Sequence, residues 1–279
     1  VRHYSNQEAY DNVASFQAPH ACNQGRMDVP AMNANPPIIL PSMVHNISHA
    51  LLEFQRQRRS QGRQATFLQI GANDGVTYDQ LYPTIHNQKS DWLGLMVEPQ
   101  PILYSQLVLL HADARGWSFY QGVVTPSCEN GIVTFCETLT PGVGDFRTQG
   151  QINGIKSQDD CAKHPGMVQV PRPCVASYNE LLEKGNAAFA NATSHANHRW
   201  VVDILQIDVE GHDYDLIQMI SSDLFFTCIN FEHKYMGHPQ TRPNYNATME
   251  KLSAVMDNNE NRMEYIRERD DTLACRVQR

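Results

Sequence analysis

A turn flanked by two glycines is the first group of residues whose types and spacing could do chemistry. Residues 71–75 read Gly-Ala-Asn-Asp-Gly and follow directly on an apolar run at 66–70. Glycine tolerates positive φ and has no side chain, so such a turn lets the backbone approach a ligand closely. The spacing differs from the G-x-G-x-x-G dinucleotide fingerprint, and the turn contains Asn73 and Asp74. Because a carboxylate repels a pyrophosphate and attracts a cation, the turn favours a positively charged ligand over a dinucleotide.

Glu98 follows the next apolar run, 93–97, at the spacing of an acid that binds ribose hydroxyls. One carboxylate can accept hydrogen bonds from both hydroxyls. Together with the acidic turn, Glu98 predicts a nucleoside ligand with a cationic end, which favours S-adenosylmethionine over NAD as the cofactor. The residues expected to bind it are Gln69, Gly71, Ala72, Asn73, Asp74, Gly75, Glu98, Pro99, Gln121 and Asp208.

Two further acids, Asp208 and Glu210, follow the most apolar run of the chain, 201–207. In an extended backbone, residues two apart point to the same side. Two carboxylates this close repel each other, which raises the pKa of one of them unless a cation lies between. We therefore expect one of the pair to be a general base or a metal ligand. The alternative is that Glu210 caps the following helix or hydrogen-bonds the turn.

His233 follows the apolar run at 225–231 and supplies an imidazole that is basic near neutral pH. Glu232 points the opposite way in a regular strand, so it could orient His233 only indirectly. The predicted catalytic residues are thus His233, Asp208, Glu210 and Glu232. The same four side chains could bind a divalent metal, but the sequence has no compact ligand motif, so a metal is not favoured.

The elements that must position these residues alternate between short apolar runs and helical patterns, which predicts an α/β fold with a parallel sheet. The runs at 66–70, 93–97, 118–124, 201–207 and 225–231 are the expected parallel strands. Residues 263–267 and 272–277 predict a closing antiparallel hairpin. Because the carboxyl ends of parallel strands share one edge, the residues named above are expected to line one crevice.

The chain is expected to divide into residues 1–60, an N-terminal arm with a lead-in helix at 42–59, and a catalytic domain over residues 61–279. The arm is rich in Asn, Gln, Pro and Ala, without sustained periodicity. Residues 139–173 are turn-rich and match no core element. A loop of this length is typical of a lid or a substrate-binding loop.

Composition restricts the partners. A net charge of -8 argues against a nucleic-acid partner, because proteins that bind nucleic acids usually carry a basic surface. No stretch approaches the roughly 18 apolar residues of a membrane span. Glycosylation sequons begin at Asn46, Asn191 and Asn246, and the first residue is Val1. These features lean towards a secretory origin with an upstream signal or anchor removed, and otherwise the chain would be cytoplasmic.

Seven cysteines leave at least one thiol unpaired. Two local pairs flank turn-like stretches and could be bridged in an oxidising compartment, Cys128 with Cys136 and Cys161 with Cys174. Cys228 and Cys275 lie in apolar, strand-like segments, where a buried free thiol is expected.

Several of these segments resemble FkbM-type methyltransferases over residues 66–279. The resemblance rests on residues 67–77, 81–83, 97–99, 207–211, 213–214 and 231–233. It implies a class I methyltransferase fold: a mostly parallel, seven-stranded, Rossmann-like sheet with a C-terminal antiparallel hairpin. It also implies an S-adenosylmethionine-dependent O-methyltransferase that acts on a hydroxyl of a sugar, glycan or small natural product. The alternatives are a Rossmann-type NAD-dependent oxidoreductase and a non-catalytic binding protein that keeps the fold.

Overall fold

A computed structural model gives the structure of the chain. It describes residues 35–42, 44–76, 79–138, 161, 167–195, 199–209, 211–234, 236, 242–258, 260–268 and 270–279. Residues 31–279 form one compact unit. Residues 1–34 of the predicted N-terminal arm lie outside the described residues. Within the described part of the chain, no helix has both the length and the hydropathy that crossing a bilayer requires.

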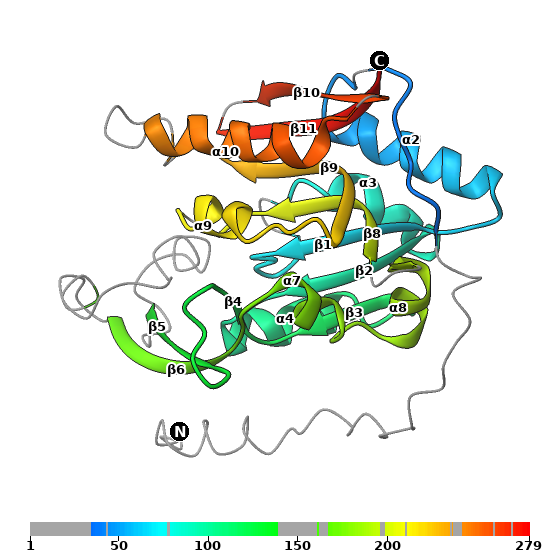
Figure 1. The fold of residues 1–279 in the computed structure, drawn as a ribbon. Coiled ribbons are helices and arrows are strands. Elements are labelled where there is room, and N and C mark those ends of the chain that lie inside the picture. Colours follow the sequence, from blue (N-terminus) through cyan, green and yellow to red (C-terminus); the bar gives the residue numbers. More distant parts are fainter. Residues whose placement is uncertain are drawn as a thin grey trace. The chain divides into compact units, whose positions relative to one another are not determined.

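The main sheet contains seven strands in one path, ordered β3-β2-β1-β8-β9-β11-β10 (Figure 1). The five parallel strands are β1 (Ala65–Ile70), β2 (Trp92–Val97), β3 (Trp117–Tyr120), β8 (Arg199–Ile207) and β9 (Leu224–Glu232). β10 (Asn261–Glu268) and β11 (Asp271–Gln278) close the sheet as an antiparallel hairpin, and short β7 (Ser194–His195) pairs with β8. The predicted α/β class, with its mostly parallel sheet and C-terminal hairpin, is confirmed.

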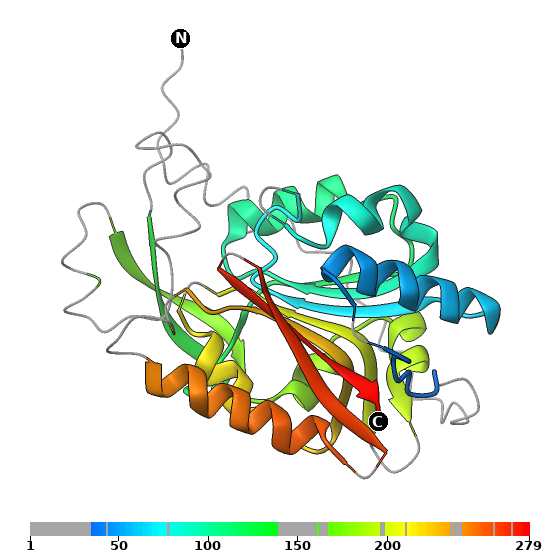
Figure 2. The ribbon, with the colours of Figure 1, turned by 90° about the horizontal axis from the view of Figure 1, so that it is seen from above.

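Helices cover both faces of this sheet, because alternate strand residues point to opposite sides. Phe67 of β1 packs in one apolar core and Leu68 in the other. The Phe67 core is covered by α2 (Ile47–Ser60), α3 (Tyr82–Ile85) and α4 (Pro101–Leu110). The Leu68 core is covered by α7 (Tyr178–Leu182), α8 (Ala187–Thr193), α9 (Asp213–Gln218) and α10 (Arg242–Met256). Figure 2 shows α2 and α4 on one side of the sheet and α10 on the other.

A second, three-stranded sheet has the order β4-β6-β5, with β4 at Val123–Val124, β5 at Ile132–Thr138 and β6 at Met167–Val175. The run expected as one strand at 118–124 is divided between β3 and β4. The loop expected over 139–173 is too long, since residues 167–173 belong to β6. Gln169 and Arg172 interrupt the apolar residues there, and Pro171 and Pro173 are unusual within a strand, so the sequence does not mark β6 and its pairing with β5 shows it instead. Residues 139–160 and 162–166 lie outside the described residues, so the lid stays a prediction.

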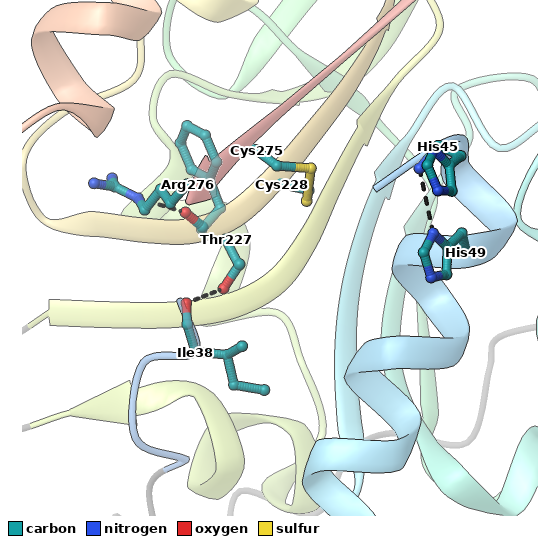
Figure 3. Close-up of a disulfide and its surroundings, with 8 residues drawn as sticks. Ile38, His45, His49, Thr227, Cys228, Cys275 and Arg276 are labelled. Carbon is teal, nitrogen blue, oxygen red and sulfur yellow. Dashed lines mark hydrogen bonds between the residues drawn. A yellow bond between two sulfur atoms is a disulfide. The ribbon is translucent and has the colours of Figure 1, made fainter. Parts of the chain in front are cut away.

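Three disulfides join the described cysteines, Cys128 to Cys174, Cys136 to Cys161 and Cys228 to Cys275. Both local pairings expected from the sequence are wrong, because the antiparallel pairing of β5 with β6 brings distant segments together. The expectation of free thiols at Cys228 and Cys275 is also wrong. These two residues are register partners on β9 and β11, with their Cα atoms 4.1 Å apart (Figure 3).

A buried ion pair fixes α2 against the amino ends of the central strands. The Arg58 and Asp203 side chains have no exposed surface, and Arg58 Nε donates to Asp203 Oδ2 over 3.0 Å. The same carboxylate oxygen accepts the Thr66 N–H of β1 over 2.9 Å, and Arg58 Nη1 donates to the Pro36 carbonyl over 2.7 Å. Both buried charges are therefore compensated by partners from separate elements.

Replacing Asp203 tests how far the fold depends on this pair. Asp203→Asn is expected to lower the free energy of unfolding by about 3–5 kcal/mol, because it leaves a buried guanidinium without its counter-charge. Urea denaturation measures this loss. Glu53→Gln is the matched control, since it breaks the exposed pair with Arg56 and should change stability very little. Equal losses in the two variants would contradict the role given to the buried pair.

Candidate functional site

The glycine turn lies where β1 is flanked by β2 on one side and β8 on the other. β2 and β3 follow β1 on one side of the sheet, whereas β8 and β9 lie on the other side of β1. The strand order therefore reverses at β1, which makes this the topological switch point at which open α/β sheets bind ligands. The Gly71 N–H donates to the Val97 carbonyl over 3.1 Å, and the Asp208 N–H donates to the Ile70 carbonyl over 3.0 Å. The turn thus joins the carboxyl ends of all three strands.

Both glycines are required by the packing of the chain itself. Gly71 has a φ of 81°, and a Cβ there would lie 1.8 Å from the Asp208 carbonyl oxygen. Gly75 has a φ of 69°, and its Cβ would lie 2.5 Å from Leu107 Cδ1 and 2.6 Å from His111 Nε2. The packing and backbone conformation of the protein itself therefore account for both glycines.

Glu98 is buried at the carboxyl end of β2, with 3 % of its surface exposed. Its Oε2 accepts the Asn73 N–H over 2.9 Å and its Oε1 accepts the Gln100 N–H over 2.8 Å. Burial raises the pKa of Glu98 to about 8, the two backbone hydrogen bonds lower it, and the charges of Glu137 and Asp74 raise it further. A carboxylate has about four lone-pair positions, so two remain for ligand hydroxyls.

The raised pKa of Glu98 has a defined effect on stability. The folded state holds its proton up to a pH of about 8, whereas the carboxyl ordinarily ionises near 4.5. The stabilisation is therefore complete below pH 4.5 and is lost as the pH rises towards and through about 8. A ligand that donates hydrogen bonds to the ionised carboxylate would offset this loss.

Ala72, Pro99 and Gln121 also lie at this edge. Ala72 is buried and its N–H donates to the Val97 carbonyl over 2.9 Å, so it contributes backbone alone. Pro99 and Gln121 are half-buried and follow the ends of β2 and β3. In the turn, Asp74 Oδ1 accepts the Val76 N–H over 2.9 Å. The predicted cofactor-binding residues thus lie together at the carboxyl ends of β1, β2, β3 and β8.

Asp213, which the sequence reasoning did not assign to the site, joins Asp208 and Glu232 in a cluster of carboxyl groups. Asp213 is 1 % exposed and its Oδ1 accepts the Glu232 N–H over 3.1 Å. Its Oδ2 has no hydrogen-bond partner among the described residues. Burial and the charges of Asp208 and Glu232 raise the pKa of Asp213 well above its usual range. Glu210, which the sequence also predicts for this site, lies outside the described residues.

A layer of buried polar side chains lies directly below the strand ends. Gln69, Gln206 and Asn230 occupy matching register positions on β1, β8 and β9. Asn230 Nδ2 donates to Gln206 Oε1 and to Gln80 Oε1, each over 3.0 Å, and Gln80 donates in turn to Asp271. Of these residues, only Gln69 is among those expected from the sequence. Gln206 and Asn230 lie within apolar runs, and their pairing becomes visible only from the strand register. The network fixes the strand ends that hold the acids.

His233 is positioned by the C-terminal hairpin and α10. Its Nδ1 lies 3.0 Å from Thr272 Oγ1, and its ring packs edge-on against Tyr245 with the ring centroids 5.8 Å apart. Thr272 Oγ1 is thus within hydrogen-bond distance of the imidazole. Burial and the charge of Arg267 lower the pKa of His233. The lowered pKa favours the neutral imidazole, which is the form that a general base requires.

The four residues considered as metal ligands are only partly described. No three or more His, Cys, Asp or Glu side chains come close enough to hold a metal ion in the part of the chain that the structure describes. Asp208, Glu232 and His233 therefore do not form such a group by themselves. Glu210, the remaining member, is outside the described residues, so metal binding by this set rests on the sequence alone.

Comparisons with known proteins give distant matches only. No protein-family model matches the chain, and no curated protein matches it. Fibrillarin from Methanococcus jannaschii, a pre-rRNA processing protein, is 11% identical over 77% of this chain and 67% of its own, with a TM-score of 0.38. The CurJ carbon methyltransferase is 12% identical over 78% of this chain and 49% of its own, with a TM-score of 0.36. The methyltransferase PaMTH1 from Podospora anserina, bound to SAH, is 10% identical over 100% of this chain and 99% of its own, with a TM-score of 0.33.

These likenesses are too distant to assign a family, and the resemblance to FkbM-type methyltransferases is not confirmed by a family model. The site geometry must therefore carry any conclusion about function.

The close approach at Gly71 generates a prediction about stability. Gly71→Ala is expected to lower the free energy of unfolding by at least about 2 kcal/mol, because it adds a clash with backbone to an unfavourable φ. Gly62→Ala is the control, since Gly62 has a similar φ of 66° but no atom within 4 Å of its Cβ position. Thermal unfolding of the two variants separates the cost of the clash from that of the backbone conformation. A similar loss in both would show that the close approach has no energetic importance.

Proposed function

We propose that this chain is an S-adenosylmethionine-dependent methyltransferase that methylates a hydroxyl group of a sugar, glycan or small natural product. One observation carries the proposal. Glu98 is buried at the switch point of the parallel sheet. Its carboxylate accepts a hydrogen bond from the Asn73 N–H of the acidic turn and retains lone pairs to accept hydrogen bonds from ribose hydroxyls. The resemblance to FkbM-type methyltransferases supports the choice of an oxygen nucleophile.

The charge around the site favours a cationic donor over NAD. Burial raises the pKa of Asp79 to about 6 against hydrogen bonds that lower it, and the charge of Asp74 raises the pKa of both Asp79 and Glu98. Asp208 adds a further acid at the end of β8. Placing a pyrophosphate among these groups would add negative charge to negative charge. An ammonium and a sulfonium group would instead reduce the repulsion, and the same ligand would bind Glu98 through its ribose hydroxyls.

The transfer step is a direct displacement. The acceptor oxygen attacks the methyl carbon, the carbon–sulfur bond breaks with its electron pair going to sulfur, and S-adenosylhomocysteine leaves. The acceptor proton passes to a base, a role that we give to the neutral imidazole of His233, held through Nδ1 by Thr272. Burial and Arg267 lower the pKa of His233, whereas the negative charge of Asp270 raises it and would stabilise the imidazolium that forms. Positioning of the two reactants supplies most of the rate.

Incubation with methyl-labelled donor and a panel of glycans and hydroxylated metabolites tests the function directly. Transfer of label to a hydroxyl is the expected result. Calorimetry with S-adenosylmethionine and with NAD, in parallel, separates the rivals. Binding of NAD alone would overturn the proposal in favour of an oxidoreductase. Donor binding without transfer to any acceptor would favour a non-catalytic binding protein.

Glu98→Gln is expected to weaken donor binding about 10- to 100-fold, because a neutral amide replaces a carboxylate that accepts from hydroxyls. In the unsubstituted protein, donor affinity should rise as the pH approaches about 8, because the ionised carboxylate of Glu98 is the form that accepts hydrogen bonds from the ribose hydroxyls. For the same reason, donor binding at pH 7 should release protons. Calorimetry in buffers of different ionisation enthalpy measures both effects. Glu183→Gln, at an exposed acid of the same type, is the control. Unchanged affinity in Glu98→Gln would remove this residue from the donor site.

His233→Gln is expected to reduce kcat about 10²- to 10⁴-fold, the usual contribution of a general base, with little change in donor affinity. The fall of kcat at acid pH should have its midpoint below 6.5, the ordinary pKa of histidine, because the pKa of His233 is lowered. This acid limb of the pH profile should be absent in the variant. Steady-state kinetics from pH 5 to 9, with the acceptor identified by screening, provides the measurement. His45→Gln is the control, because His45 is an exposed histidine that precedes α2 in the chain. An acid limb that survives in His233→Gln would exclude the imidazole as base.

A further inference from the structure

The three disulfides indicate the kind of compartment in which this chain folds. All six described cysteines are paired, and Cys22 lies outside the described residues. Disulfides form and persist in oxidising compartments, whereas the thiol pools of the cytosol keep cysteines reduced. Each bridge requires two thiols to be oxidised, with two electrons passed by thiol–disulfide exchange to the oxidants of that compartment.

The Cys228–Cys275 bridge is built into the core. Both residues are fully buried and directly opposite each other on neighbouring antiparallel strands, so their side chains share one face of the sheet. In Figure 3 the bridge lies beside Thr227, whose hydroxyl donates to the Ile38 carbonyl over 2.7 Å. Dissolved reductants cannot reach a sulfur pair at this depth without opening the sheet. The bridge therefore forms during folding, which must take place where thiols are oxidised.

The sequon at Asn46 places its acceptor amide on the surface. Asn46 is exposed and caps α2, with its Oδ1 accepting the His49 N–H over 2.8 Å. The Nδ2 atom, to which a glycan attaches, has no hydrogen-bond partner among the described residues. An N-linked glycan would therefore leave the helix cap in place. Ser48, the third residue of the sequon, is half-buried on the first turn of α2.

The sequon at Asn246 has the same accessibility. Asn246 is exposed on α10, while its neighbour Tyr245 faces inwards and contacts His233. A glycan on Asn246 would therefore extend into solvent and away from the candidate site. The Thr248 hydroxyl of this sequon is buried and bonds to Met236 Sδ over 3.6 Å.

The third sequon differs. Asn191 is half-buried in α8, and the two residues that follow it, Ala192 and Thr193, are buried. The Thr193 hydroxyl donates to the Phe189 carbonyl over 2.8 Å within the same helix, and the Ala192 carbonyl accepts the Asn35 N–H over 2.8 Å. Asn191 therefore has less open surface than Asn46 or Asn246, and its buried neighbours disfavour a bulky glycan there.

We propose that this chain folds in an oxidising, glycosylating compartment and carries N-linked glycans on Asn46 and Asn246, but not on Asn191. In the attachment step, Asn Nδ2 loses a proton and bonds to the anomeric carbon of an oligosaccharide, whose lipid pyrophosphate carrier leaves. The oligosaccharide donor and the transferase belong to the compartment and not to this chain. The proposal does not depend on the methyltransferase function.

Peptide mass spectrometry of the protein isolated from its natural source tests the proposal. Treatment with peptide N-glycosidase converts a glycosylated Asn to Asp, so Asp is expected at 46 and 246, and unchanged Asn at 191. Peptide mapping without reductant should recover the three cross-linked cysteine pairs. Unmodified Asn46 or Asn246, a modified Asn191, or alkylation of the six cysteines in the protein as isolated would overturn the proposal.

Variants secreted from cultured cells separate glycosylation from folding. Asn46→Asp keeps a capping oxygen for α2 and removes the glycosylation site, so it should lose one glycan and still be secreted. Asn246→Asp should lose the other glycan. Ser48→Thr is the matched control, because it preserves the sequon and should keep the full mass. Loss of no mass in either Asp variant would contradict the assignment of the two sites.

Discussion

The close approach of β1 to β8 at Gly71 is the constraint on which the rest of the site depends. The Asp208 carbonyl occupies the space where any side chain of residue 71 would lie, so the two strand ends meet at contact distance. That contact places Asp208 beside the turn and leaves the turn's inner residues facing the edge of the sheet. The position of the acids is therefore set by backbone packing before any ligand is present.

The acids at this edge are tolerated because the backbone compensates them in different ways. Glu98 accepts two N–H groups, and Asp213 accepts one from Glu232. Burial still raises the pKa of both groups, so ionising either carboxyl group in the free site costs free energy. A cationic nucleoside donor would relieve this cost on binding, which links the stability of the fold to occupancy of the site.

The hairpin that closes the sheet connects the candidate chemistry to the disulfide framework. β11 contributes Cys275 to the buried bridge with β9 and, three residues earlier in the chain, Thr272 to the imidazole of His233. The bridge spans 47 residues of sequence, so it restricts the unfolded chain substantially. The bridge therefore holds β11 against β9, and with it the position of Thr272 beside the His233 imidazole.

The sequence by itself determined the α/β class, the central strands, the closing hairpin and the grouping of Gly71, Glu98 and Asp208, because apolar periodicity and strand-end residues are local properties of the chain. The tertiary structure alone decided what depends on neighbours distant in sequence. It gave the cysteine pairing, since register places Cys228 opposite Cys275. It also gave the burial of Asp213, the contact of Thr272 with His233 and the strand β6. Its most direct contribution concerns Gly71, where only the folded chain shows that the missing side chain makes room for the Asp208 carbonyl.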